Sequence, residues 1–138
     1  MAVMSWLIDK SALVRLSGSD DAALWADRLG RGLVRTTTIT LLEVGFSARS
    51  GRALRDAVGR PPLSSMPVEF ISPAAERRAL EVQAVLADQG LHRAPSLPDL
   101  LIAAVAERVG STLLHLDKDF ELIAGVTGQP VERLSGLR

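Results

Sequence analysis

The 138-residue chain contains no cysteine, which excludes disulfide bonds, thiolate metal sites and thiol nucleophiles. A reducing cytoplasm is compatible with this composition, and we expect a cytoplasmic protein. The chain also lacks an apolar run approaching the ~18 residues that a membrane-spanning helix needs, and residues 1–8 carry no charged leader ahead of a long apolar stretch. The sequence therefore predicts a soluble protein with no membrane partner.

Net charge is also absent, because 16 basic residues balance 16 acidic residues and the pI is about 6.7. This balance argues against long-range, sequence-independent attraction to nucleic acid, although it leaves room for a local basic rim beside an acidic site. The only lysines are Lys10 and Lys118, and the other basic residues are arginines, whose planar forks suit phosphate. An arginine-rich composition can equally reflect the genome, so composition alone does not indicate a nucleic-acid-binding protein.

What the chain does have is enough apolar material for one domain spanning residues 1–138: 47% of the residues are apolar and the mean hydropathy is +0.20. Hydrophobic patterning predicts strands that alternate with helices almost throughout. The strands are expected at 2–8, 33–36, 68–71, 111–116 and 131–134, and the helices at 11–16, 20–29, 38–48, 51–58, 74–88 and 98–106, with a short helix ending at 124. Ser19 or Asp20 is expected to cap the second of these helices. This alternation implies an α/β fold with a mainly parallel central sheet of four to five strands flanked by helices.

Four acidic residues fall where a parallel sheet would bring them to one edge. Asp9 ends the first predicted strand and Asp117 ends the fourth, while Asp99 and Glu43 lie near the starts of two helices. Ligands of open parallel sheets bind at the carboxyl ends of the strands. Close carboxylates repel one another, and burying unpaired ones costs several kcal/mol each. A cation is therefore expected among them, and a donor set of oxygens favours Mg²⁺ or Mn²⁺ over zinc.

Each acid also has a purely structural interpretation. Asp9 is suited to cap the short helix that follows it, Asp99 to complement a helix dipole, and Glu43 to be an ordinary helix acid. Either Asp117 or Asp119 is expected to cap the next helix, and Asp119, which is nearer the helix body, is the better candidate. The metal-site hypothesis therefore depends on the acids taken together and on their order along the chain.

Other residues with chemical potential are better explained by packing. His115 lies on a predicted buried strand, so we interpret it as a structural histidine rather than a general base. Trp6 and Trp25 could stack on bases, but both lie in apolar, regular segments, so core packing is expected for at least one of them. Phe120 is also expected in the core. His92 and the neighbouring Arg93 precede Asp99 in a loop, where contact with RNA and plain solvent exposure are equally compatible with the sequence.

The segments around the acids resemble the motifs of PIN-domain ribonucleases, and most closely those of the VapC toxins of bacterial type II toxin–antitoxin pairs. The matching segments are 7–13 (LIDKSAL), 40–44 (TLLEV), 95–104 (PSLPDLLIAA) and 114–120 (LHLDKDF). The third segment is the most specific match, and together the motifs cover almost the whole domain. The resemblance implies a single PIN-like domain with a metal-dependent endoribonuclease activity that inhibits translation or growth.

By position, the resemblance assigns the acidic metal site to Asp9, Glu43, Asp99 and Asp117, with Asp119 as a further metal-binding acid. Ser11 matches a small hydroxyl residue that orients a carboxylate or binds phosphate. Lys10 departs from the pattern, because relatives often have a neutral hydroxyl residue there; its cation is suited to reduce the negative charge of the site or to touch RNA. The implied partners are the RNA substrate, a small VapB-type antitoxin and a second copy of the chain. Apolar helix faces between residues 38 and 58 offer material for such contacts.

Three alternative functions place different demands on the sequence. A phospho-accepting receiver-like domain would need paired acids near the first strand and a late lysine, whereas only Asp9 ends that strand and no lysine follows Lys118. A haloacid-dehalogenase-type phosphatase would need an Asp-x-Asp opening, which is absent. A catalytically inactive PIN-fold binding module is disfavoured by the intact acids. The sequence does not name the RNA, the number of metal ions or the antitoxin.

Overall fold

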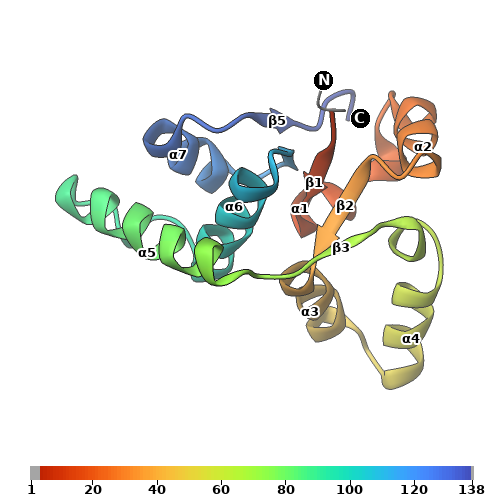
Figure 1. The fold of residues 1–138 in the computed structure, drawn as a ribbon. Helices are drawn as coiled ribbons and strands as arrows, with labels where there is room; N and C mark the ends of the chain where they lie inside the picture. The colour runs from red at the N-terminus through yellow and green to blue at the C-terminus, as the bar shows by residue number, and fades with distance from the viewer. Residues whose placement is uncertain (1–3, 138) are drawn as a thin grey trace.

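A computed structural model describes residues 4–137, and its strands form one five-stranded sheet in the order β3-β2-β1-β4-β5 (Figure 1). Every neighbouring pair in the sheet is parallel. The strands are β1 (Trp6–Ile8), β2 (Val34–Thr37), β3 (Val68–Glu69), β4 (Thr112–His115) and β5 (Val131–Arg133). The predicted α/β fold is therefore confirmed. The first strand is shorter than predicted, and residues 2 and 3 of that prediction lie outside the described part of the chain.

Within residues 4–137, seven α-helices cover the two faces of the sheet. They are α1 (Lys10–Leu13), α2 (Ala22–Gly30), α3 (Thr38–Ser47), α4 (Gly51–Gly59), α5 (Pro73–Asp88), α6 (Leu97–Val109) and α7 (Lys118–Thr127), with 3₁₀ turns at Leu16–Gly18 and Leu63–Ser65. Side-chain oxygens of Thr37, Ser50, Ser72 and Ser96 cap four of them by accepting backbone amides. The expectation that Ser19 or Asp20 caps α2 is wrong: the 3₁₀ turn places Asp21 at that position, and its side chain makes no capping bond. Among residues 4–137, no helix is long and apolar enough to cross a membrane.

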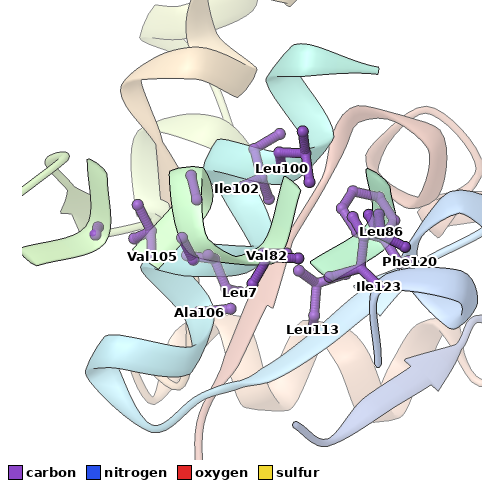
Figure 2. Close-up of a cluster of buried hydrophobic side chains, with 14 residues drawn as sticks. Leu7, Val82, Leu86, Leu100, Ile102, Val105, Ala106, Leu113, Phe120 and Ile123 are labelled. Atoms are coloured by element: carbon purple, nitrogen blue, oxygen red, sulfur yellow. The ribbon is translucent and has the colours of Figure 1, made fainter. Parts of the chain in front are cut away.

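The core is divided by the sheet into two apolar clusters, because alternate residues of β1 point to opposite faces. Leu7 packs with α5, α6 and α7, and Figure 2 shows this cluster around Val82 and Ile102. Trp6 and Ile8 belong to the other cluster, with α1 and α2. Trp6 and Trp25 meet edge to face with ring centroids 5.3 Å apart, and both are buried. The prediction that at least one tryptophan packs in the core is therefore confirmed, and it holds for both.

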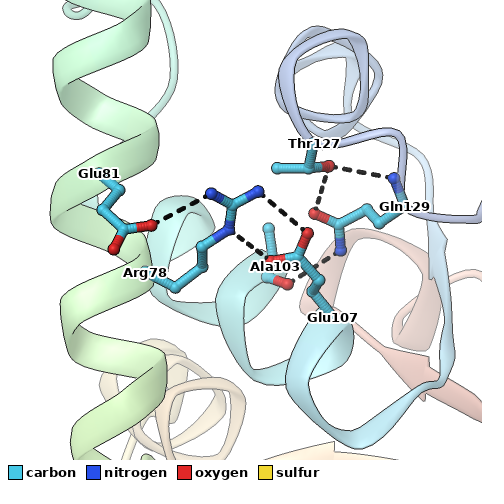
Figure 3. Close-up of polar contacts among 6 residues, drawn as sticks. All are labelled: Arg78, Glu81, Ala103, Glu107, Thr127 and Gln129. Carbon is cyan, nitrogen blue, oxygen red and sulfur yellow. Dashed lines mark hydrogen bonds and ion pairs between the residues drawn. The ribbon is translucent and has the colours of Figure 1, made fainter.

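Polar contacts as well as apolar packing hold the C-terminal half of helix α6 in place. Arg78 of α5 donates from Nε to Glu107 Oε1 at 2.7 Å and from Nη2 to Oε2 at 3.2 Å (Figure 3). Gln129 donates from Nε2 to the Ala103 carbonyl at 2.9 Å, and its Oε1 accepts the Thr127 hydroxyl at 2.9 Å. These contacts hold the C-terminal half of α6, so its N-terminal turn has a defined position at the carboxyl edge of the sheet.

Candidate active site

The carboxyl ends of the two central strands, β1 and β4, provide two of the acids predicted from the sequence. Asp9 follows β1 directly and Asp117 lies two residues beyond β4, while α6 carries Asp99 in its first turn and α3 carries Glu43. The strand order reverses between β1 and β4, which is where open parallel sheets bind ligands. A cleft of about 300 Å³ opens at this point and is lined by all five acids together with Lys10, Ser11, Val14 and Ser96. The structure thus brings together every acid that the sequence nominated.

Three of the acids form a tighter group. One carboxylate oxygen from each of Asp99, Asp117 and Asp119 lies within 4.8 Å of the others. This all-oxygen set suits a hard divalent cation and provides no nitrogen or sulfur ligand that would favour zinc. Asp9 and Glu43 are outside this group but interact electrostatically. Burial is the main cause that raises the pKa of Glu43, and the negative charge of Asp9 raises it further.

Asp9 is held by three contacts. Its Oδ1 accepts the Ala12 backbone amide at 3.2 Å, which caps α1, and the Ser11 hydroxyl lies 2.7 and 2.8 Å from its two carboxylate oxygens. The same hydroxyl accepts the Leu116 backbone amide at 2.9 Å. Asp9 is only 4% exposed, and burial raises its pKa against the lowering effect of the Ser11 hydrogen bond. Asp9 therefore caps α1 and also lines the cleft. Ser11 connects this acid to the segment that follows β4.

Asp99 is the most perturbed acid of the cleft. It is 7% exposed, and burial, the negative charge of Asp117 and a hydrogen bond with the Asp119 carboxylate together raise its pKa to about 8. Without a cation, Asp99 is therefore mainly protonated at neutral pH, and that proton offsets the repulsion within the group. A divalent cation has the opposite effect, because it stabilises the ionised carboxylates and releases the proton.

Ser96 joins two of these acids and was missed as a site residue in the sequence. Its hydroxyl accepts the Asp99 backbone amide at 3.2 Å, which caps α6, and its own backbone amide donates to Asp119 Oδ2 at 3.2 Å. A serine three residues before an acid at the start of an apolar run is a helix-capping signal. That signal was available in the sequence, but it points only to a cap and not to the contact with Asp119.

The expectation that Asp119 caps α7 is wrong, because Asp117 does so. The backbone of Asp117 is extended (φ −122°, ψ 123°) and its Oδ1 accepts the Asp119 amide at 3.0 Å. A capping residue must precede the helical turn, and Asp119 is already inside that turn. The carboxylate of Asp119 is consequently available to Ser96 and to the group around Asp99.

His115 is fully buried, and it contacts the backbone of the site residue Asp117. Its Nδ1 accepts the Asp117 backbone amide at 3.1 Å, and its ring lies 5.5 Å from that of Phe120. Burial lowers the pKa of His115, so the ring is neutral at neutral pH. These observations favour the structural interpretation of this histidine.

Comparison with known proteins agrees with this geometry. Residues 6–126 match the model of the PIN domain. The chain is 59% identical to Ribonuclease VapC2 of Mycobacterium tuberculosis, over 98% of this chain and 96% of the relative. The structure resembles that of VapBC2 from Rickettsia felis bound to a DNA fragment from its promoter (TM-score 0.77, 18% identity, 94% of this chain and 98% of that one).

A second solved relative is M. tuberculosis VapC20, described as a sarcin-ricin loop cleaving toxin (TM-score 0.61, 25% identity, 86% of this chain and 94% of that one). The family-model match and the identity to VapC2 each extend over most of the chain. The chain therefore belongs to the PIN domain family and, within it, to the VapC ribonucleases.

Proposed function

We propose that this protein is a Mg²⁺- or Mn²⁺-dependent endoribonuclease that acts in the cytoplasm as the toxin of a toxin–antitoxin pair. The observation that carries the proposal is the cleft at the carboxyl edge of β1 and β4, which five carboxylates line. The 59% identity to a VapC ribonuclease supports RNA as the substrate. The receiver-like and phosphatase alternatives gain no support, because the end of β1 supplies one acid and not a pair.

We assign the direct metal ligands to Asp99, Asp117 and Asp119, with Asp9 completing the site. A bound divalent ion would lower the pKa of a water and neutralise the charge that develops on the phosphate in the transition state. Glu43, on the α3 side of the cleft, would orient the attacking water or help to hold a second ion. Addition of water to phosphorus with cleavage of the bond to the 3′ oxygen leaves a 5′-phosphate and a 3′-hydroxyl.

Cleavage of RNA is expected to depend strictly on divalent metal. Transfer RNA, ribosomal RNA and messenger RNA would be incubated with the purified chain, and the ends of the fragments sequenced. Because the carboxylates repel one another without a cation, EDTA should lower cleavage by at least ~100-fold, and Mg²⁺ or Mn²⁺ should restore it. Asp88→Asn, which removes an exposed acid at the end of α5, is the control and should cleave RNA with the same metal dependence as the parent chain. Cleavage that persists undiminished in EDTA would contradict the proposal.

Apolar surface beside the cleft supports the second proposed partner, another copy of the chain. Leu42 and Phe46 of α3, which flank Glu43, are 69% and 93% exposed. Leu97, two residues before Asp99, is exposed as well, and it lines an apolar groove between α5 and α6 together with the exposed Leu80. Solvent-exposed leucine and phenylalanine on both sides of one cleft are typical of a protein interface. We propose that a homodimer buries these residues.

For the antitoxin we propose the surface formed by α1, α2 and α4. Two apolar grooves of about 380 and 290 Å³ adjoin there and share Leu13 and Pro62 as lining residues. Leu13 ends α1, the helix that Asp9 caps, so a segment bound in these grooves starts one helical turn from the acids. Binding there would let an antitoxin reach and block the cleft.

Phe46→Ser is expected to weaken the homodimer by at least about 100-fold in dissociation constant, because a symmetric dimer buries this side chain twice and each burial contributes about 1.5–3 kcal/mol. Sedimentation equilibrium over a range of protein concentrations would measure the change. Val109→Ser removes another exposed apolar side chain at the far end of α6 and should leave the dimer intact. The homodimer proposal would be contradicted if the parent chain were monomeric at every concentration.

A further inference from the structure

Lys10 is the only cation among the described residues that line the cleft, where it faces five carboxylates. Its side chain does not end among the acids: Nζ donates to the hydroxyl of Ser47, the last residue of α3. The ammonium therefore lies at the border between the acidic cleft and the connection from α3 to α4. Its charge also lowers the pKa of Glu43, although burial and Asp9 outweigh it.

The segment that follows Ser47 carries only basic charges, in contrast to the acidic cleft. Residues 44–55 contain three arginines, Arg49, Arg52 and Arg55, and no aspartate or glutamate. All three are exposed, and none has an ion-pair partner within residues 4–137. In contrast, Arg60 at the other end of α4 pairs with Asp56. These three arginines therefore hold no carboxylate in an ion pair within the described part of the chain.

The side chain of Arg55 lies against the start of α4, on the side of the connection from α3. A side-chain carbon built on Gly51 would lie 2.9 Å from Arg55 Nη1, so the guanidinium folds back over the first turn of α4. It thereby approaches the connection that carries Arg49, rather than extending toward Asp56 and the end of the helix. Gly51 leaves the space that this arrangement needs.

We propose that Lys10, Arg49, Arg52 and Arg55 form a phosphate-binding track that holds the RNA strand where it leaves the acidic cleft. This inference rests on the proposed ribonuclease function. A protein with no net charge and a cleft of five carboxylates repels a polyanion at close range, and screening limits attraction from distant charges to about 10 Å at 0.1 M salt. RNA binding thus requires uncompensated cations next to the cleft, and Lys10 connects the cleft to the segment that supplies them.

The track is tested by the salt dependence of RNA binding, which counts phosphate contacts. A fluorescein-labelled, single-stranded oligoribonucleotide of mixed sequence would be titrated with the full chain carrying Asp99→Asn, in Mg²⁺, over a series of KCl concentrations. Each phosphate contact on a single strand contributes ~0.7 to the slope of log K against log salt. Adding Arg49→Gln and Arg52→Gln should lower that slope by ~1.4, and Lys10→Gln alone by ~0.7.

Two matched pairs control for fold and for general charge. Arg77 and Arg108 are exposed arginines on α5 and α6 that also lack an ion-pair partner within residues 4–137. Arg108 lies nine residues beyond Asp99 on α6, about 13 Å along the helix. Changing both of these to Gln should leave the slope unchanged. Arg49→Lys with Arg52→Lys keeps the charge and should restore the parent slope.

The outcomes separate the track from the function on which it rests. If the metal-loaded parent chain cleaves RNA but the Arg49/Arg52 double variant keeps the parent slope, the track is wrong and the function stands. Equal losses in the control pair would also overturn the track, because general charge would then explain binding. If the same arginine changes weaken binding to an acidic protein segment but not to RNA, the surface is a protein interface instead. If the parent chain cleaves no RNA, the proposed function itself fails.

Discussion

Replacing Asp99 by asparagine is expected to reduce RNA cleavage about a thousandfold or more, and at the same time to stabilise the metal-free fold at neutral pH. The loss of activity follows because the buried member of the group formed by Asp99, Asp117 and Asp119 can no longer ligate a cation as a carboxylate. Metal stabilisation of a phosphoryl transition state contributes several kcal/mol. The gain in stability follows because asparagine keeps the shape of the side chain and is neutral without a proton. Folding at neutral pH instead obliges the Asp99 carboxyl, whose pKa is raised to about 8, to take up a proton that the unfolded chain has released.

Opposite signs in the two measurements distinguish a site residue from a structural one. Cleavage rates with saturating Mn²⁺ and thermal unfolding in EDTA would be measured on the same preparations, with Asp88→Asn as the control for loss of an exposed carboxylate. A structural aspartate would instead lose stability when its charge is removed. Wild-type cleavage by the Asp99→Asn protein would exclude Asp99 from the metal site.

Asp9→Asn should also lose cleavage but should not gain comparable stability. The Asp9 carboxylate accepts from both Ser11 and the Ala12 amide, and an asparagine can present only one oxygen to these donors. The two variants together test the assignment of the site more strictly than either alone. Undiminished cleavage by both variants would defeat the metal-site hypothesis.

Sequence patterning was sufficient for the parallel sheet and for the edge at which the acids meet. This is because strand and helix periodicity are local, and because Asp9 and Asp117 follow buried strands directly. The contacts that organise the cleft are not local. Ser11 accepts the Leu116 amide across 105 residues, and Lys10 reaches Ser47 across 37. Such pairs depend on how α1, α3 and β4 pack, and no spacing rule in a single sequence specifies them.

The incorrect cap assignments have a related cause. Asp117 and Asp119 are both good capping residues, and the choice depends on where the backbone changes from extended to helical. Element boundaries are the least certain part of a sequence-based prediction, since helix ends fray and short turns shift them. A similar uncertainty of one or two residues places the N-cap of α2 at Asp21 rather than at Ser19 or Asp20. Identity of the acids was therefore predictable, whereas the partner of each carboxylate was not.

The metal-free protein should lose stability as the pH rises from about 4 to about 8. Because the pKa of Asp99 is raised from 3.8 to about 8, the folded chain keeps a proton in this range that the unfolded chain releases. Stability therefore falls with rising pH, by up to about 5 kcal/mol from this group, because each pKa unit corresponds to about 1.4 kcal/mol. Burial raises the pKa values of Asp9 and Glu43 in the same direction. His115 acts oppositely below about pH 6.5, since its pKa is lowered, so the contribution of Asp99 is the difference between the parent and Asp99→Asn.

Divalent metal should reverse this pH dependence. Mn²⁺ at 100 times its dissociation constant adds about 2.7 kcal/mol to the free energy of unfolding, or a rise of about 8–10 °C in Tm for a domain of this size. The rise should be largest near pH 8, where the acids ionise readily, and small near pH 5, where the ion must displace a proton from Asp99. Calorimetry with EDTA and with Mn²⁺ at both pH values would measure it. Only the parent has the full set of carboxylates that a cation would hold together. An equal rise in Tm with Mn²⁺ in the parent and in Asp99→Asn would therefore show that the ion binds elsewhere.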